Sequence, residues 1–96
     1  MIRLIDITDD DIKNGVQGEC DKCAIALALK REYKTDDVFV HVTDDTSTPC
    51  LQVNKKDLNF RYENDVLDFI DCFDNQDNMD YASPKPFTLE VVEWKN

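Results

Sequence analysis

The chain has 96 residues and a formal net charge of −10, from 21 acidic and 11 basic side chains. This charge repels nucleic acid and acidic lipid and attracts basic surfaces, so it argues against direct binding to nucleic acid or membrane. The length allows one hydrophobic core, and 42% hydrophobic residues are typical of a globular protein. We therefore expect a single domain over residues 1–96.

The N-terminal half is predicted to contain two strands and two helices. A strand over residues 2–7 is followed by a short helix over 9–14, with Thr8 as its N-cap. A second helix is predicted from Asp21 to about Tyr33, because residues 24–29 are apolar on every side, as in a buried helix. Alternation over residues 38–42 predicts a strand with its valines on one face and with Phe39 and His41 on the other.

The C-terminal half is predicted to add a hairpin, a helix and a last strand. Residues 51–53 and 58–62 are expected to pair through a turn at 54–57, and the last strand runs from Phe87 toward Trp94. Because strands are grouped and their connections are short, we predict an α+β fold. In this fold a mostly antiparallel sheet of about four to five strands packs against two to three helices.

A long acidic stretch coincides with the predicted third helix. Residues 63–80 contain seven acidic side chains and no basic one, and six of these are aspartates at every third position. They are Asp65, Asp68, Asp71, Asp74, Asp77 and Asp80. The apolar positions, at three- and four-residue spacing, are Val66, Phe69, Ile70 and Phe73. We expect Asn64 to cap an amphipathic helix with an acidic outer face.

The acidic face has two explanations, and the sequence leaves both open. Asp71 and Asp74 stand near the negative end of the helix dipole, where each should cost about 0.3 to 1 kcal/mol. One explanation is solubility, which acidic surfaces favour. The other is recognition, because carboxylates on a rigid face can imitate duplex phosphates or engage the basic groove of a nucleic-acid-binding protein.

Cys20 and Cys23 form the strongest candidate for chemistry. Two cysteines separated by two residues at a helix start can hold zinc or exchange disulfides. The further ligands that a closed zinc site needs would have to come from Cys50, Cys72 or His41, which are isolated in the sequence. A plain structural role is the alternative, with Cys23 as a small buried hydrophobic residue.

Two further patterns in the sequence are weaker candidates for chemistry. Residues 74–80 carry oxygen ligands at alternate positions, as a calcium loop does, but they lack the central glycine and the terminal glutamate of such loops. His41 is the single histidine and has no neighbouring nucleophile in a recognisable setting. No catalytic signature is present, so we predict that the protein is not an enzyme.

The segment Gly15–Leu29 resembles one found in small uncharacterised bacteriophage proteins. Those have a short strand, an I-x-x-G helix end, the pattern G-x-C-x-x-C-x-I-A-L-A-L and a C-terminal Pro-Phe-x-Leu/Phe strand. This chain carries Gly18, the cysteine pair and Pro86-Phe87-Thr88-Leu89 at corresponding places, with Ala24 where the relatives have proline. The resemblance implies a phage accessory protein that binds a component of the infected bacterium, and it implies no catalytic residues.

The function predicted is therefore that of a small acidic phage accessory protein that modulates or inhibits a host protein with a basic surface, such as that of a nucleic-acid-binding protein. Its predicted binding residues are Asp65, Asp68, Asp71, Asp74 and Asp77. No cofactor is expected, although zinc at Cys20 and Cys23 stays open. The alternatives are a zinc-stabilised or redox domain and a virion-associated subunit. With no apolar run long enough for a signal peptide or a membrane span, we expect a location in the host cytoplasm.

Overall fold

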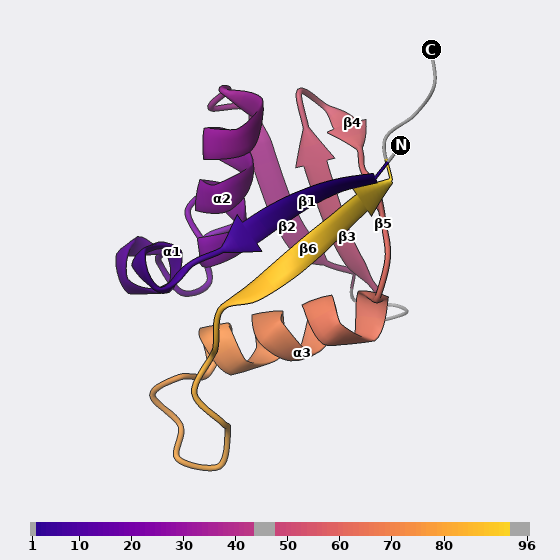
Figure 1. Cartoon of the computed structure of the whole chain (residues 1–96). Coiled ribbons are helices and arrows are strands. Elements are labelled where there is room, and N and C mark those ends of the chain that lie inside the picture. The colour runs from indigo at the N-terminus through magenta and orange to yellow at the C-terminus, as the bar shows by residue number, and fades with distance from the viewer. Residues whose placement is uncertain (1, 44–47, 93–96) are drawn as a thin grey trace.

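A computed structural model describes residues 2–43 and 48–92, which form three helices and six strands (Figure 1). The helices are α1 (Asp9–Asn14), α2 (Ala24–Tyr33) and α3 (Glu63–Asp74). The strands are β1 (Ile2–Ile7), β2 (Val38–Val42), β3 (Pro49–Val53), β4 (Lys56–Asp57), β5 (Asn59–Phe60) and β6 (Phe87–Val92). The predicted α+β class is confirmed.

The strands form two antiparallel sheets, where we had expected one sheet of four to five strands. The strand orders are β1-β6-β5 and β2-β3-β4. The first sheet joins the two ends of the described chain, because β1 pairs with β6 from Ile2 opposite Val92 to Ile7 opposite Phe87. Figure 1 shows this pair crossing in front of the second sheet, with α3 below both.

One core lies between the two sheets and the helices. The alternating pattern of β1 and β6 turns Ile5 and Leu89 inward, and β2 and β3 contribute Val40 and Leu51. In α2 the side chains of residues 24–26, 28 and 29 are buried, as the apolar run predicts. The three buried residues of α3 are Val66, Phe69 and Phe73. The four longer strands, β1, β2, β3 and β6, and the helices α2 and α3 therefore contribute their buried side chains to the same core.

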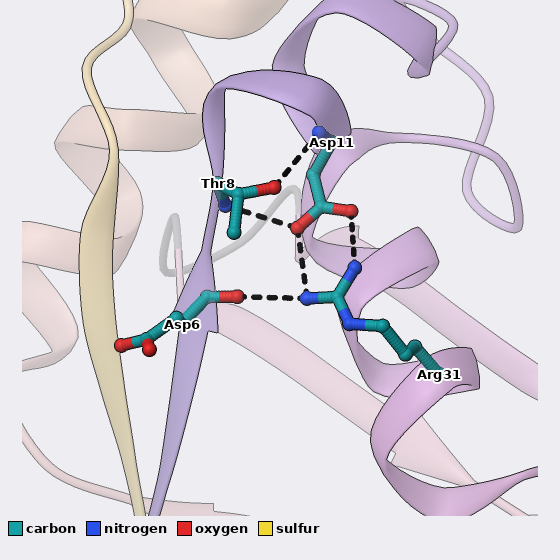
Figure 2. Close-up of polar contacts among 4 residues, drawn as sticks. All are labelled: Asp6, Thr8, Asp11 and Arg31. Carbon is teal, nitrogen blue, oxygen red and sulfur yellow. Dashed lines mark hydrogen bonds and ion pairs between the residues drawn. The ribbon is translucent and has the colours of Figure 1, made fainter.

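The start of α1 is fixed by a polar cluster around the buried side chain of Asp11 (Figure 2). Thr8 caps the helix as predicted: its Oγ1 accepts a hydrogen bond from the Asp11 N–H at 3.2 Å, and Asp11 Oδ2 accepts one from the Thr8 N–H at 2.9 Å. Arg31 of α2 donates to both Asp11 oxygens, at 2.7 and 3.1 Å, and to the Asp6 carbonyl at 3.0 Å. Asp11 is only 4% exposed, so this cluster ties α1 to α2 and β1.

The predicted pairing of residues 51–53 with 58–62 was wrong. Strand β3 turns back after Val53 through two residues, Asn54 and Lys55, which have positive φ values of 53° and 67°, and pairs with β4. Two consecutive residues in the left-handed region are typical of a tight type I′ turn, for which Asn-Gly is the usual sequence. The chain then crosses at Leu58, so that Phe60 pairs with Val91 of the other sheet.

Two predicted helix starts also differ from the structure. Helix α2 begins at Ala24, with Cys23 as its N-cap, because residues 16–22 are closed by turns such as Lys22 N–H to the Glu19 carbonyl at 3.2 Å. Helix α3 begins at Glu63, and Tyr62 occupies the cap position at φ 60° without a side-chain cap. Asn64 is therefore inside the helix. The predicted end of the last strand at Trp94 lies outside the described residues.

Candidate protein-binding surface

The six regularly spaced aspartates, called here the acidic stripe, all lie at the surface. Asp65, Asp68, Asp71 and Asp74 belong to α3, and Asp77 and Asp80 follow in the turns after it. All six are exposed. Within residues 2–43 and 48–92, no ion pair joins any of these carboxylates to a basic side chain. Their negative charge is therefore not neutralised by the part of the chain that the structure describes.

The acidic stripe crosses α3 obliquely. An α-helix turns about 100° per residue, so a three-residue step falls about 60° short of a full turn. From Asp65 to Asp74 the carboxylates consequently sweep about half of the helix circumference. Asp68 and Asp71 lie on the outer side, opposite the buried Phe73. Asp74 reaches the far flank, where its Oδ1 accepts a hydrogen bond from the Gly18 N–H at 3.1 Å.

The helix that carries the first four aspartates of the acidic stripe is firmly packed. Its inner side buries Val66, Phe69 and Phe73 in the core. The Phe69 ring lies 4.8 Å from that of Phe87 and 6.1 Å from that of Phe73, measured between centroids. Because the inner face is anchored, the exposed carboxylates project from a fixed backbone. This limits the conformational entropy that ordering them would cost on binding.

Local stability does not account for the whole acidic stripe. The last turn of α3 has no basic residue, and Asp71 and Asp74 stand there at the negative end of the helix dipole. Carboxylates in this position should each destabilise a helix by about 0.3 to 1 kcal/mol. Asp65, in the first turn, has the favourable position. Asp71 is therefore kept at a small energetic cost, whereas the hydrogen bond from the Gly18 N–H offsets this cost at Asp74.

A groove of about 420 Å³ runs along one flank of the acidic stripe. We call it the α3 groove; one wall is α3 and the other is the segment 82–89 that leads into β6. Its buried lining is apolar and includes Val66, Phe69 and Leu89. Its charged lining residues are Asp65 and Asp68 on the α3 wall, with Arg61 and Lys85, and all four are exposed. The groove thus has an apolar floor and a charged rim.

The two cysteines of the predicted metal or redox site have different surroundings. Cys23 is 8% exposed and Cys20 is half-buried, and both thiols are free. Burial raises the pKa of the Cys23 thiol, and this outweighs the hydrogen bonds from the N–H groups of Ala26 and Ile25 that lower it. A reactive dithiol requires the opposite shift. The surroundings of Cys23 therefore favour a protonated, structural thiol.

A second cavity, of about 270 Å³, brings His41 next to the cysteine pair. It is lined by Cys20, Cys23 and His41, together with Asp74 at the end of α3. The His41 Nδ1 atom is buried and has no hydrogen-bond partner among the described residues. Even so, no three His, Cys, Asp or Glu side chains of residues 2–43 and 48–92 come close enough together to hold a metal ion, in this cavity or in the predicted calcium loop.

Two of these arrangements were missed by sequence reasoning. His41 was treated as isolated, although the β2 backbone is joined to the cysteine loop by the Val40 N–H and the Cys20 carbonyl at 2.8 Å. The α3 groove was missed because its second wall comes from residues 82–89, whose composition carries no interaction motif. The prolines at 84 and 86 were the available signal, since they predict an irregular connection.

Comparisons of the chain with protein-family models, with curated proteins and with solved structures found no match. Within the described residues, none of the helices has the length and apolar character needed to cross a membrane.

Proposed function

We propose that this protein binds a basic surface of another protein through the acidic stripe. The observation that carries the proposal is the set of exposed carboxylates Asp65, Asp68 and Asp71, on a helix anchored in the core and without ion pairs to other described residues. Charges arranged in this way steer an oppositely charged partner and raise the association rate. Catalysis is not part of the proposal.

The partner class follows from the charge and from the resemblance to phage proteins. A surface of lysines and arginines is the complement of the acidic stripe, and such surfaces are common on proteins that handle nucleic acid. In the setting that the resemblance suggests, the partner is a protein of the infected bacterium, and occupation of its basic surface modulates or inhibits it. Asp74 and Asp77 would extend the contact beyond α3.

Affinity capture from a bacterial lysate tests the proposal. The test variant carries Asp68→Asn and Asp71→Asn, and the control variant carries Asp36→Asn and Asp37→Asn, which remove the same charge from exposed positions outside α3. We expect the wild type and the control to retain a basic protein at low salt and to lose it at high salt, because the screening length falls from about 10 Å at 0.1 M to about 3 Å at 1 M. Equal capture by both variants would contradict the proposal.

The predicted zinc site is a second candidate. One observation favours it: Cys20, Cys23 and the unpartnered Nδ1 of His41 line the same cavity, so a rearrangement of these side chains would be needed to bring them within reach of one metal ion. Thiolate and imidazole are the ligands that zinc prefers. Elemental analysis of protein purified without chelator tests this candidate. Stoichiometric zinc that is lost together with the fold on chelation would support it, and metal-free folded protein would exclude it.

A further inference from the structure

We infer that the α3 groove receives a large apolar side chain of the partner, while basic residues next to that side chain contact Asp65 and Asp68. This inference rests on the proposed function and specifies the partner: a protein segment in which an apolar anchor is flanked by lysine or arginine. The acidic stripe then supplies attraction and orientation, and the groove supplies the buried contact.

The distribution of polarity in the groove matches a protein interface. Interfaces between proteins have an apolar core surrounded by a polar rim, and a few buried anchors carry most of the affinity. Here the buried lining residues Val66, Phe69 and Leu89 are apolar, and the charged lining residues are exposed at the rim. Small-molecule sites instead place a few polar groups inside the pocket to fix the ligand. The groove therefore fits a protruding side chain better than a polar metabolite.

The charges across the groove give the occupant an orientation. The α3 wall carries Asp65 and Asp68, and the acidic stripe continues beyond it at Asp71. The opposite wall carries Lys85 between two prolines. Arg61, which precedes α3, is the other basic residue of the lining. A segment with basic residues next to its anchor is attracted by Asp65 and Asp68 and repelled by Lys85 and Arg61, so the acidic stripe beyond the groove supplies the net attraction. Removing the charge of Asp65 and removing the charge of Lys85 should therefore have opposite effects on affinity.

The exposed rim and the volume of the groove also suit a side chain that enters from another protein. The segment that forms its second wall leads into β6 beside α3 (Figure 1), and residues 82 and 83 at its rim are exposed. The groove volume of about 420 Å³ lies near the lower end of the range of about 300 to 1,000 Å³ that binding pockets occupy. This space suits an anchor side chain with its neighbouring backbone.

Three synthetic peptides of equal length serve as probes. The first has a central Phe-Leu pair flanked by lysines and arginines, the second replaces that pair with Ser-Ser, and the third replaces the basic residues with glutamate. Fluorescence anisotropy measures binding at low salt. We expect the first peptide to bind about tenfold or more tighter than the second, which corresponds to burying one large apolar side chain. The third should not bind.

Variants of the protein locate the binding. Ala82→Trp fills the groove from an exposed rim position and should weaken the first peptide about tenfold. Met79→Trp is the control, because Met79 is 99% exposed in the same loop and does not line the groove. Asp65→Asn should weaken binding about two- to fivefold, as expected for an exposed charge pair, and Lys85→Gln should strengthen it.

Alkylation of Cys72 gives a readout that needs no substitution. Cys72 is half-buried and lines the α3 groove, whereas Cys20 lies in the other cavity and Cys50 on β3. We expect the first peptide at saturation to slow modification of Cys72 by iodoacetamide, with no change at Cys20 or Cys50. The Ser-Ser peptide should protect Cys72 less.

The outcomes separate this inference from the proposed function. One outcome overturns only this inference: the first two peptides bind with equal affinity, Ala82→Trp leaves both affinities unchanged, and Asp65→Asn weakens both. In that case the acidic surface binds basic peptides without the groove. If Ala82→Trp weakens binding but Asp65→Asn does not, the basic character of the partner is wrong and the proposed function loses its support. Failure of the first peptide to bind overturns the inference.

Discussion

Replacing Arg31 with methionine should destabilise the fold strongly at neutral pH and weakly in acid. Arg31 is the basic partner of Asp11, whose carboxylate is 4% exposed and is held between the α1 cap and α2 (Figure 2). Methionine retains much of the aliphatic length of arginine and removes the guanidinium. The variant thus leaves a buried carboxylate whose remaining hydrogen-bond partner is Thr8.

The magnitude follows from the uneven burial of the pair. Removing one partner of a fully buried ion pair costs about 3 to 5 kcal/mol, whereas a hydrogen bond to a charged group contributes about 1.5 to 3 kcal/mol. The Arg31 side chain is 53% exposed and that of Asp11 is 5% exposed. The pair is therefore intermediate, and we expect a loss of about 2 to 3 kcal/mol. In a domain of this size that lowers Tm by roughly 10 to 20 °C.

The pH dependence comes from the pKa of Asp11. Burial raises this pKa, but the hydrogen bonds from Arg31 and Thr8 outweigh burial and hold it below the ordinary value of 3.8. A carboxyl whose pKa is lowered by folding stabilises the protein above its unfolded pKa, and this stabilisation is lost as the pH falls through the folded pKa. Without Arg31, burial dominates and the pKa of Asp11 should rise. The cost of the substitution should therefore shrink in acid.

Urea denaturation measures both the loss of stability and its pH dependence. The wild type and Arg31→Met are compared at neutral pH and at a pH below the ordinary pKa of aspartate. Lys30→Met is the matched control, because Lys30 is the other basic residue in the last turn of α2. It should cost less than about 1 kcal/mol, the usual value of a helix-dipole interaction. A loss in Arg31→Met that equals the control, or that stays constant between the two pH values, would refute the role assigned to the pair.

Three further substitutions or treatments test the packing and the turns. Gly15→Ala should destabilise the fold by about 1 to 3 kcal/mol, because a Cβ at this position would lie 2.7 Å from the Ala24 nitrogen and 2.9 Å from the Phe73 ring. An unchanged Tm in thermal unfolding would contradict this close approach. Lys55→Gly should stabilise the β3–β4 hairpin by up to about 1 kcal/mol, because Lys55 has a φ of 67°, which glycine adopts without strain. A lower Tm for this variant would show that strain at this turn does not limit the stability of the protein. Cys23 should react with iodoacetamide more slowly than Cys20 in the native protein, and the two should react at the same rate in urea. Mass spectrometry measures both rates, and equal rates in the native protein would contradict the burial of Cys23.

Most of the local structure was predictable because it depends on neighbours in the sequence. The Thr8 cap follows from a hydroxyl residue just before a helix start, and the strand over Val38–Val42 and the apolar spacing of α3 follow from periods of two and 3.6 residues; the structure confirms all three. The division into two sheets was not predictable in this way. It depends on the tight turn at Asn54 and Lys55, where lysine replaces the glycine that usually marks such a turn.

The candidate surface was predictable only in part. The apolar spacing predicted the helix that carries Asp65, Asp68, Asp71 and Asp74, and the exposure of Asp68 and Asp71 follows from the burial of the opposite side. The α3 groove depends on residues 82–89 returning beside the helix, a long-range contact that no local pattern encodes. The same holds for the approach of His41 to Cys20 and Cys23. That the acidic stripe binds a partner stays a prediction.

The salt dependence of partner affinity tests that prediction most directly. The protein captured from the lysate is purified and titrated over a series of salt concentrations with the wild type and with the variant carrying Asp65→Asn, Asp68→Asn and Asp71→Asn. Because exposed charges are screened by salt, we predict that the Kd of the wild type rises steeply with salt and that the variant binds more weakly with a shallower dependence. Equal affinities and equal salt dependences for the two proteins would show that the acidic stripe is not the binding surface.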